Sequence, residues 1–273
     1  VRGHTDVIVS EERPVPLHQH MIFSHKFLPL FAAKGELAAV NPEVMQTAQM
    51  LGRGGSHRPK SRGAPRYQRY EDQRHKVYRS DVVEQLGDED LLPAIFFIFS
   101  RKGCDQAVSQ VLRRGVTLTE EYERDQILDL VEERCDRLDD DDRNVLGYHE
   151  WLDGILRGVA AHHAGMLPMF KEVVEELFRR KLLKVVFATE TLALGINMPA
   201  RTVVLEKLDK FNGEARVPIT AGEYTQLTGR AGRRGIDSEG HSVVIWQPGI
   251  IPEAVAALAS RRSYPLKSSF SPT

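Results

Sequence analysis

Short runs of apolar, often β-branched residues alternate along the chain with longer segments whose apolar residues repeat with a helical period. This alternation is typical of a parallel β-sheet covered by helices, because a buried strand is apolar throughout whereas a covering helix has one apolar stripe. We therefore predict an α/β fold with three layers, a parallel sheet with helices on both faces. Strands are predicted near residues 18–23, 94–99, 158–162, 184–189, 202–206 and 242–246.

The clearest helical pattern lies between the third and fourth of these strands. Pro168 suits a first helical turn, and apolar residues follow at i, i+3, i+4, i+7 and i+8. These positions are Phe170, Val173, Val174, Leu177 and Phe178. The pattern predicts a βαβ unit over residues 158–189.

Two stretches do not fit the sheet pattern. Residues 52–79 are rich in Arg, Lys, Gly, Pro and Ser and poor in branched aliphatic residues, so we predict a flexible basic insertion. It could clamp a phosphate backbone or be a solvated linker, and both interpretations stay open. Residues 119–143 are a charged helical pattern ending in "DRLDDDDR", and we interpret them as a solvated helix and an acidic turn instead of a metal-binding cluster.

The composition limits the classes of function. The formal net charge is −1, so any nucleic-acid site must be local. Cys104 and Cys135 have neither CxxC spacing nor a matching histidine pair, which speaks against a metal site or a disulfide framework and favours a reducing cytoplasm. No apolar run reaches the ~18 residues of a membrane span, so no membrane partner is expected.

The stretch "QLTGRAGRRG", residues 226–235, holds three arginines and three glycines. Thr220 and Glu223 have capping-box spacing, so we predict a helix that begins there and continues through the arginines. At 3.6 residues per turn one face would then carry Gln226, Gly229, Arg230 and Arg233. A neighbouring apolar stripe for docking on the sheet would consist of Tyr224, Leu227 and Ala231.

Arginine suits phosphate oxygens because its planar, permanently charged group forms paired hydrogen bonds. Two positioned arginines can stabilise the charge that develops on a transferred γ-phosphoryl group. We therefore expect the guanidinium groups of Arg230 and Arg233 to project side by side toward a cleft. If those two side chains are splayed apart, or buried in ion pairs within this chain, the interpretation as a motor fails.

Three predicted strands end in residues suited to binding phosphate. The strand at 184–189 ends at Thr189, the strand at 94–99 is followed by Ser100, Arg101 and Lys102, and the strand at 158–162 leads into "HHAG". Any one of these turns could occur in an ordinary α/β fold. Ligands of open α/β sheets bind at the carboxyl ends of the strands, and three such ends together favour an anion-binding edge.

Four segments carry a resemblance to a known family. "FFIFSRKGCDQAV", "AAHHAGMLP", "VVFATETLALGINMPARTVV" and "QLTGRAGRRG" occur in this order and resemble motifs IV, IVa, V and VI of helicase superfamily 2. The wording is most similar to that of the superkiller-type DExH-box RNA helicases, including bacterial members. The resemblance covers roughly residues 94–247, and "VSEERPVPLHQHM" at 9–21 resembles the segment that joins the two motor lobes.

The resemblance implies the second of two RecA-like lobes that clamp ATP and Mg²⁺ and move 3′ to 5′ along RNA. Arg230 and Arg233 would be the catalytic arginine fingers. The implied ATP-binding residues are Gln226, Gly229, Gly195 and Asn197. The implied nucleic-acid-binding residues are Ser100, Arg101, His163, Gly165, Thr189 and Glu190.

The chain has no G-x-x-x-x-G-K-[ST] phosphate loop and no DExH box. We expect both in a preceding lobe of the same protein, so this fragment alone is expected to be an inactive monomer that relies on that lobe for ATP and Mg²⁺. The expected domains are a lead-in with the first strand at 1–31, an insertion at 32–92, the RecA-like domain at 93–247 with a helical and acidic insertion at 115–150, and a helix that starts a downstream domain at 248–273.

Two other classes of function are alternatives to the motor lobe. A RecA-like module that binds nucleic acid or protein without hydrolysis would not need a γ-phosphate sensor. A dinucleotide-binding oxidoreductase needs a G-x-G-x-x-G loop after a strand, and none occurs here. The sequence leaves RNA and DNA open as substrates, and only the family resemblance favours RNA.

Overall fold

The computed structural model describes residues 13, 15–24, 26–32, 39–54, 77–195 and 198–260. Within these residues a seven-stranded sheet has the order β2-β1-β9-β6-β3-β5-β4. Its strands are β1 (Leu17–Phe23), β2 (Lys26–Pro29), β3 (Ala94–Phe97), β4 (Val159–His162), β5 (Val185–Ala188), β6 (Thr202–Leu205) and β9 (Gly240–Ile245). All neighbours pair in parallel except β2, which runs antiparallel to β1 at the edge.

All six predicted strands are present, with ends that differ from the predicted ones by at most two residues. The side chains of β3 alternate between the two faces of the sheet. Ala94 and Phe96 contribute to one buried cluster, whereas Ile95 and Phe97 contribute to the other. A fully apolar strand is what this double burial requires, and the predicted sheet is confirmed.

Helices cover both faces, which confirms the three-layer arrangement. The helices α3 (Arg79–Asp88) and α4 (Arg101–Arg113) bury their apolar residues in one cluster. The opposite cluster receives side chains from α1 (Pro42–Gly54), α5 (Glu121–Cys135), α7 (Tyr148–Leu156), α8 (Pro168–Arg179), α9 (Leu192–Gly195), α10 (Ala221–Thr228) and α11 (Pro252–Ser260). The sheet therefore lies between two helical layers, as in a RecA-like domain.

The predicted βαβ unit at 158–189 is confirmed as β4, α8 and β5. Pro168 occupies the first turn of α8, and all five residues of the predicted apolar stripe are buried. The spacing of the apolar residues therefore predicted correctly which face of this helix packs on the sheet.

The segment at 119–143 differs from its prediction. Helix α5 is not solvated on all sides, because Ile127, Leu130 and Val131 are buried and the helix contacts α8. The acidic run instead begins α6 (Asp140–Val145), where the Asp139 side chain accepts a hydrogen bond from the Asp142 backbone N–H. Carboxylates at a helix N-terminus are stabilised by its positive end.

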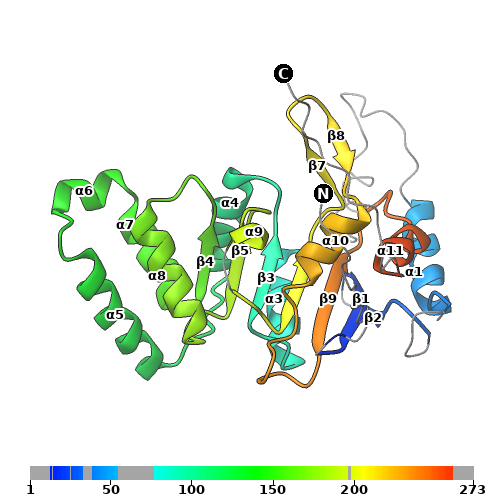
Figure 1. The fold of residues 1–273 in the computed structure, drawn as a ribbon, viewed down its shortest axis with the longest axis horizontal. Helices are drawn as coiled ribbons and strands as arrows, with labels where there is room; N and C mark the ends of the chain where they lie inside the picture. Colours follow the sequence, from blue (N-terminus) through cyan, green and yellow to red (C-terminus); the bar gives the residue numbers. More distant parts are fainter. Residues whose placement is uncertain are drawn as a thin grey trace, which may run out of the picture.

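The elements follow one another along the sheet (Figure 1). Helices α5 and α6 lie beyond β4 at one end, and α1 and α11 lie together beyond β1 and β2 at the other. A hairpin of β7 (Asp209–Phe211) and β8 (Arg216–Pro218) projects past the sheet. In the described part of the chain no helix has the length and apolar character needed to cross a membrane.

Helix α1 and helix α3 flank most of the predicted basic insertion. Residues 55–76 of that insertion lie outside the described residues, so its flexibility and its role stay predictions. Helix α3 itself is part of the core, since Val82, Val83 and Leu86 are buried. The domain boundaries given above also stay predictions.

Candidate functional site

Three strand ends meet at one edge of the sheet. Strands β3, β5 and β4 are parallel neighbours, so the residues that follow them share the carboxyl edge. The structure thereby brings together the turns that contain Ser100, Gly165 and Thr189. This placement confirms that the predicted anion-binding residues lie at one edge, while their contacts with a ligand stay predictions.

Ser100 caps helix α4. Its Oγ accepts a hydrogen bond from the Gly103 backbone N–H at 3.2 Å, which satisfies one of the unpaired donors of the first turn. Gly103 has no room for a side chain, because a Cβ would lie 2.8 Å from Cγ2 of Ile98. Arg101 is exposed at this helix start, where its charge is accessible to an anion.

Two adjacent histidines fix the end of β4. Nε2 of His162 lies 2.9 Å from Oε1 of Glu175 on α8, and Nε2 of His163 lies 2.9 Å from Oδ1 of Asp105 on α4. Both imidazoles are buried. Burial lowers the pKa of His162, and its hydrogen bond to the Glu175 carboxylate only partly offsets this effect. The strand end is thus tied to one helix on each face of the sheet.

His163 also shapes the turn that follows β4. Its Nδ1 accepts a hydrogen bond from the Gly165 backbone N–H at 3.1 Å, so the proton is assigned to Nε2, which donates to Asp105. Both ring nitrogens are engaged in this conformation. The direct nucleic-acid contact expected of His163 stays a prediction, and its observed bonds hold Gly165 in place.

The end of β5 is connected to the hairpin and to α10 through one lysine. Nζ of Lys210 on β7 lies 2.7 Å from Oε2 of Glu190 and 2.6 Å from Oε1 of Glu223. These two carboxylates raise the pKa of Lys210. Thr189 shares a hydrogen bond of 2.9 Å with Thr191 through their hydroxyl groups. Sequence reasoning missed Lys210, because its partners are distant in the chain.

The capping box at the start of α10 is confirmed. The Thr220 hydroxyl accepts from the Glu223 backbone N–H at 3.2 Å, and the Glu223 carboxylate accepts from the Thr220 backbone N–H at 2.7 Å. Tyr224 and Leu227 are buried against the sheet, as predicted. The hydroxyl of Tyr224 donates to Oε1 of Gln19 on β1 at 2.7 Å, which fixes the helix on the lead-in strand.

The predicted continuation of this helix through the arginines is wrong. Helix α10 ends at Thr228, so Gly229, Arg230 and Arg233 do not share a helical face with Gln226. Gly232 has φ +83°, a left-handed conformation that breaks the helical path and suits glycine. The sequence from Gly229 to Asp237 forms a loop, which we call the arginine loop.

The arginine loop packs closely against neighbouring backbone. Ala231 forms a parallel bridge with Ala200. A Cβ on Gly232 would lie 2.7 Å from Cγ1 of Val15, and a Cβ on Gly240 would lie 2.6 Å from the backbone N of Gly232. Gly232 of this motif and Gly240 at the start of β9 are therefore needed for close packing, in addition to any contact with a ligand.

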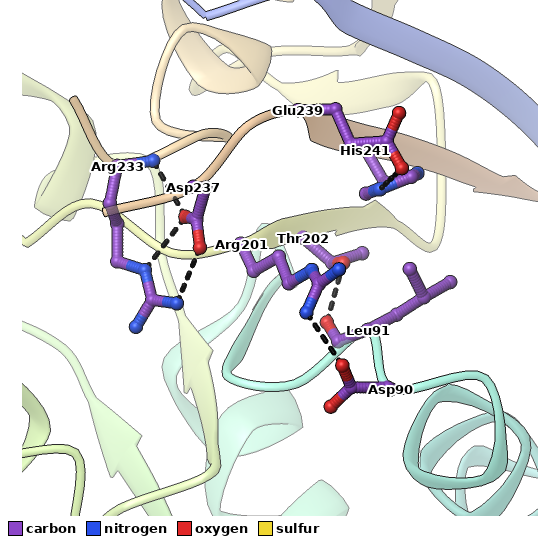
Figure 2. A network of polar contacts seen from close by, with 8 residues as sticks. All are labelled: Asp90, Leu91, Arg201, Thr202, Arg233, Asp237, Glu239 and His241. Carbon is purple, nitrogen blue, oxygen red and sulfur yellow. Dashed lines mark hydrogen bonds and ion pairs between the residues drawn. The ribbon is translucent and has the colours of Figure 1, made fainter. Parts of the chain in front are cut away.

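The arginines expected to act as a pair have different partners. Nη2 of Arg230 donates to the Ala193 backbone carbonyl, which connects the loop to α9. The Asp237 carboxylate instead binds Arg233, with Oδ2 2.7 Å from Nε and Oδ1 2.6 Å from Nη2 (Figure 2). The side chain of Arg233 is 12% exposed and that of Asp237 is 5% exposed. Arg233 therefore lies in an ion pair within this chain, against the expected arrangement.

Asp237 was missed by the sequence reasoning, although a carboxylate four residues after Arg233 is a readable signal. Burial alone would raise the pKa of Asp237, but the hydrogen bonds and charge of Arg233 hold it below its ordinary value. Figure 2 also shows Arg201, whose Nη1 lies 2.9 Å from Oδ2 of Asp90. The charge of Arg201 further lowers the pKa of Asp237.

The remaining predicted residues are only partly placed. Gln226 is exposed on α10, and Gly195 ends α9. Asn197 lies outside the described residues. Among the residues that the structure does describe, no group of three or more His, Cys, Asp or Glu side chains gathers to hold a metal ion.

Comparison with known proteins places this geometry in context. Residues 116–235 match the family described as helicase conserved C-terminal domain. The chain is 54% identical over 281 residues to probable helicase HelY of Mycobacterium tuberculosis (strain ATCC 25618 / H37Rv), an alignment that covers 100% of this chain and 30% of the relative. It is also 36% identical over 281 residues to DExH-box ATP-dependent RNA helicase DExH15 chloroplastic of Arabidopsis thaliana, covering 90% of this chain and 22% of that protein.

A human relative extends this range. Superkiller complex protein 2 of Homo sapiens is 36% identical over 260 residues, which cover 90% of this chain and 20% of that protein. The chain thus spans about 30% or less of the length of these relatives.

Proposed function

We propose that this chain, which matches the helicase conserved C-terminal domain over residues 116–235 and is similar over its full length to probable helicase HelY, is the second motor lobe of an ATP-dependent RNA helicase of the superkiller type. The lobe would close on a first lobe with ATP and Mg²⁺ between them. The arginine loop would face the phosphates, and the carboxyl edge of β3, β5 and β4 would contact the nucleic-acid backbone.

The observation that carries the proposal is the connection between these two regions. Nη2 of Arg230 bonds the backbone of α9, which begins shortly after β5. A change at the loop on nucleotide binding would therefore act directly on the segment that follows Thr189. Such a connection is what a motor needs to couple hydrolysis to movement along a strand.

Arg233 can contribute although it is paired. Asp237 occupies Nε and Nη2, and a guanidinium has five N–H donors. Within the described residues Nη1 of Arg233 has no hydrogen-bond partner, and this atom is not fully buried. Nη1 can therefore meet a phosphate oxygen while the pair stays intact.

RNA is the proposed substrate because DExH15 is named an RNA helicase, and 3′-to-5′ movement is proposed from the resemblance of the four motifs to superfamily 2. The predicted contacts are to the backbone and do not read bases, so single-stranded DNA is the competitor to compare in the same assay. We also propose that the protein acts in the cytoplasm and that the isolated lobe is a monomer.

The test is hydrolysis of ATP by the full-length protein with and without RNA. Arg233→Ala should lower the RNA-stimulated rate by about 100-fold or more, since removal of one donor from a developing charge has that effect. The matched control is Arg234→Ala, because Arg234 is the exposed neighbour in the same loop. The isolated lobe should hydrolyse no ATP.

A binding module without hydrolysis is the second candidate, favoured by the burial of the Arg233–Asp237 pair. It would bind RNA tightly without ATP, and Arg230→Ala would leave that affinity unchanged. If the full-length protein binds RNA in this way and RNA does not stimulate its ATP hydrolysis, the binding module replaces the motor lobe as the proposed function.

A further inference from the structure

The carboxylate of Asp237 forms three hydrogen bonds with one residue. Oδ2 accepts from the Arg233 backbone N–H at 2.8 Å and from its Nε at 2.7 Å, and Oδ1 accepts from Nη2 at 2.6 Å. Charge-assisted bonds of this bidentate kind fix the orientation of a guanidinium as well as its position. The side chain of Arg233 is therefore held at both its base and its tip.

The backbone of the arginine loop supports the same arrangement. The backbone N–H groups of Ile236 and Asp237 donate to the Arg233 carbonyl at 3.1 Å and 2.9 Å. Gly235 has φ +76°, which closes the turn between the two partners. The carboxylate is thus delivered to Arg233 by a hydrogen-bonded turn and does not depend on a flexible side chain from elsewhere.

The pairing has a direction. Asp237 approaches along the side of the guanidinium that carries Nε and Nη2, and Figure 2 shows the remaining nitrogen pointing away from the carboxylate. A head-on pair would have used both terminal nitrogens and left no tip for another anion. The side-on pair keeps Nη1 available for an oxygen outside this chain.

We infer that Asp237 is a positioning residue that fixes Arg233 by its Nε side so that Nη1 is presented to the phosphate of a bound nucleotide. This inference rests on the proposed function, because it assumes that Arg233 meets ATP. It differs from a lock, in which Asp237 would compete with the phosphate and have to release Arg233 before hydrolysis.

The test is Asp237→Asn in the full-length protein, which keeps the shape of the side chain but removes its charge and one acceptor. The expected result is a fall in kcat for RNA-stimulated hydrolysis of about 10- to 100-fold, since a small misplacement of a catalytic group has this effect. KM for ATP and RNA affinity without nucleotide should change by less than about twofold, because Asp237 touches neither ligand in this arrangement.

The matched control is Asp153→Asn. Asp153 lies on helix α7, away from the arginine loop, and pairs at 3.0 Å with Arg157, also four residues later, which follows the last residue of that helix. This variant should keep the wild-type kcat. A double-mutant cycle then tests whether Asp237 acts through Arg233. If it does, Asp237→Asn should have no further effect on kcat in an Arg233→Ala background.

Each contrary outcome has its own meaning. A wild-type or raised kcat in Asp237→Asn, or an equal loss in the Arg233→Ala background, would overturn the positioning role. A wild-type kcat in Arg233→Ala would instead overturn the proposed function. If Asp237→Asn fails to fold, Asp237→Glu keeps the charge and shifts it by one methylene, and it should lower kcat with KM unchanged; an unaltered kcat there also overturns the inference.

Discussion

The carboxyl edge at β3, β5 and β4 and the arginine loop lie in one lobe but are stabilised differently. The edge is held by side chains that reach across from helices, as His162 does to Glu175 and His163 to Asp105. The arginine loop is in addition closely packed, since a Cβ on Gly232 would lie 2.7 Å from the Val15 side chain and a Cβ on Gly240 would lie 2.6 Å from the backbone N of Gly232.

This difference predicts how each region responds to substitution. A hydrogen-bonded pair can lose one partner and keep the backbone path, whereas a glycine in such close packing cannot accept a methyl group unless its neighbours move. Single substitutions at the edge should therefore lower the free energy of unfolding moderately, whereas a substitution of Gly232 or Gly240 should lower it strongly.

The largest effect is expected at Gly232. Gly232→Ala should lower the free energy of unfolding by about 3 kcal/mol, since a left-handed conformation costs about 1–2 kcal/mol for other residues and overpacking adds about 1–3 kcal/mol. Gly235→Ala is the control, because Gly235 is also left-handed, with φ +76°, but a Cβ would meet nothing within 4 Å. It should cost only about 1–2 kcal/mol. Denaturant unfolding of both variants measures the difference, and equal losses would contradict the role of close packing.

A moderate effect is expected at the edge. Glu175→Ala removes the partner of Nε2 of His162, whose Nδ1 is already buried without a partner in the described structure. The loss should be about 1–3 kcal/mol, the usual cost of a buried polar group left unsatisfied. Glu172→Ala, at an exposed position on the same helix, should stay within about 0.5 kcal/mol of wild type. Thermal unfolding compares the two, and equal melting temperatures would remove the distinction.

The smallest effect is expected for a step of one pH unit, and it concerns His20 on strand β1, outside both regions. Burial, with the neighbouring His241 and His18, lowers the pKa of His20 to about 3. Between that value and the ordinary value near 6.5 the unfolded chain binds one more proton than the folded one. This group should therefore make the free energy of unfolding fall as pH falls from 6.5, by at most about 1.4 kcal/mol per pH unit. His20→Gln should flatten that slope in denaturant titrations, and an unchanged slope would show that His20 does not contribute.

The sequence predicted the elements whose pattern is local. Apolar runs such as 94–97 gave all six parallel strands, the spacing from Phe170 to Phe178 gave α8, and Thr220 with Glu223 gave the start of α10. Each of these signals depends on neighbours within one or two turns. The resemblance to helicase motifs was likewise confirmed, because it rests on contiguous residues.

The arginine loop could not be obtained by extending a helical period. In the sequence the helical repeat of 3.6 residues continues through Gly229. In the structure Gly232 faces the backbone of Gly240, and the chain leaves the helical path there. That contact depends on the position of β9 in the sheet, which local spacing does not encode. Lys210 was missed for the same reason. The apolar face of α5, in contrast, was readable from Ile127, Leu130 and Val131, and the density of charged residues obscured it.

Arg13 connects the lead-in to the loop in a way that has a mechanical consequence. Its Nη2 donates to the backbone carbonyls of Ala231 and Thr228, at 2.5 Å and 3.4 Å. Strand β1, only a few residues later, pairs directly with β9. A force that pulls on the chain ahead of β1 is therefore transmitted to the arginine loop both near its start, through Arg13, and after its end, through β9. The loop must then move with that segment, or both hydrogen bonds from Arg13 must break.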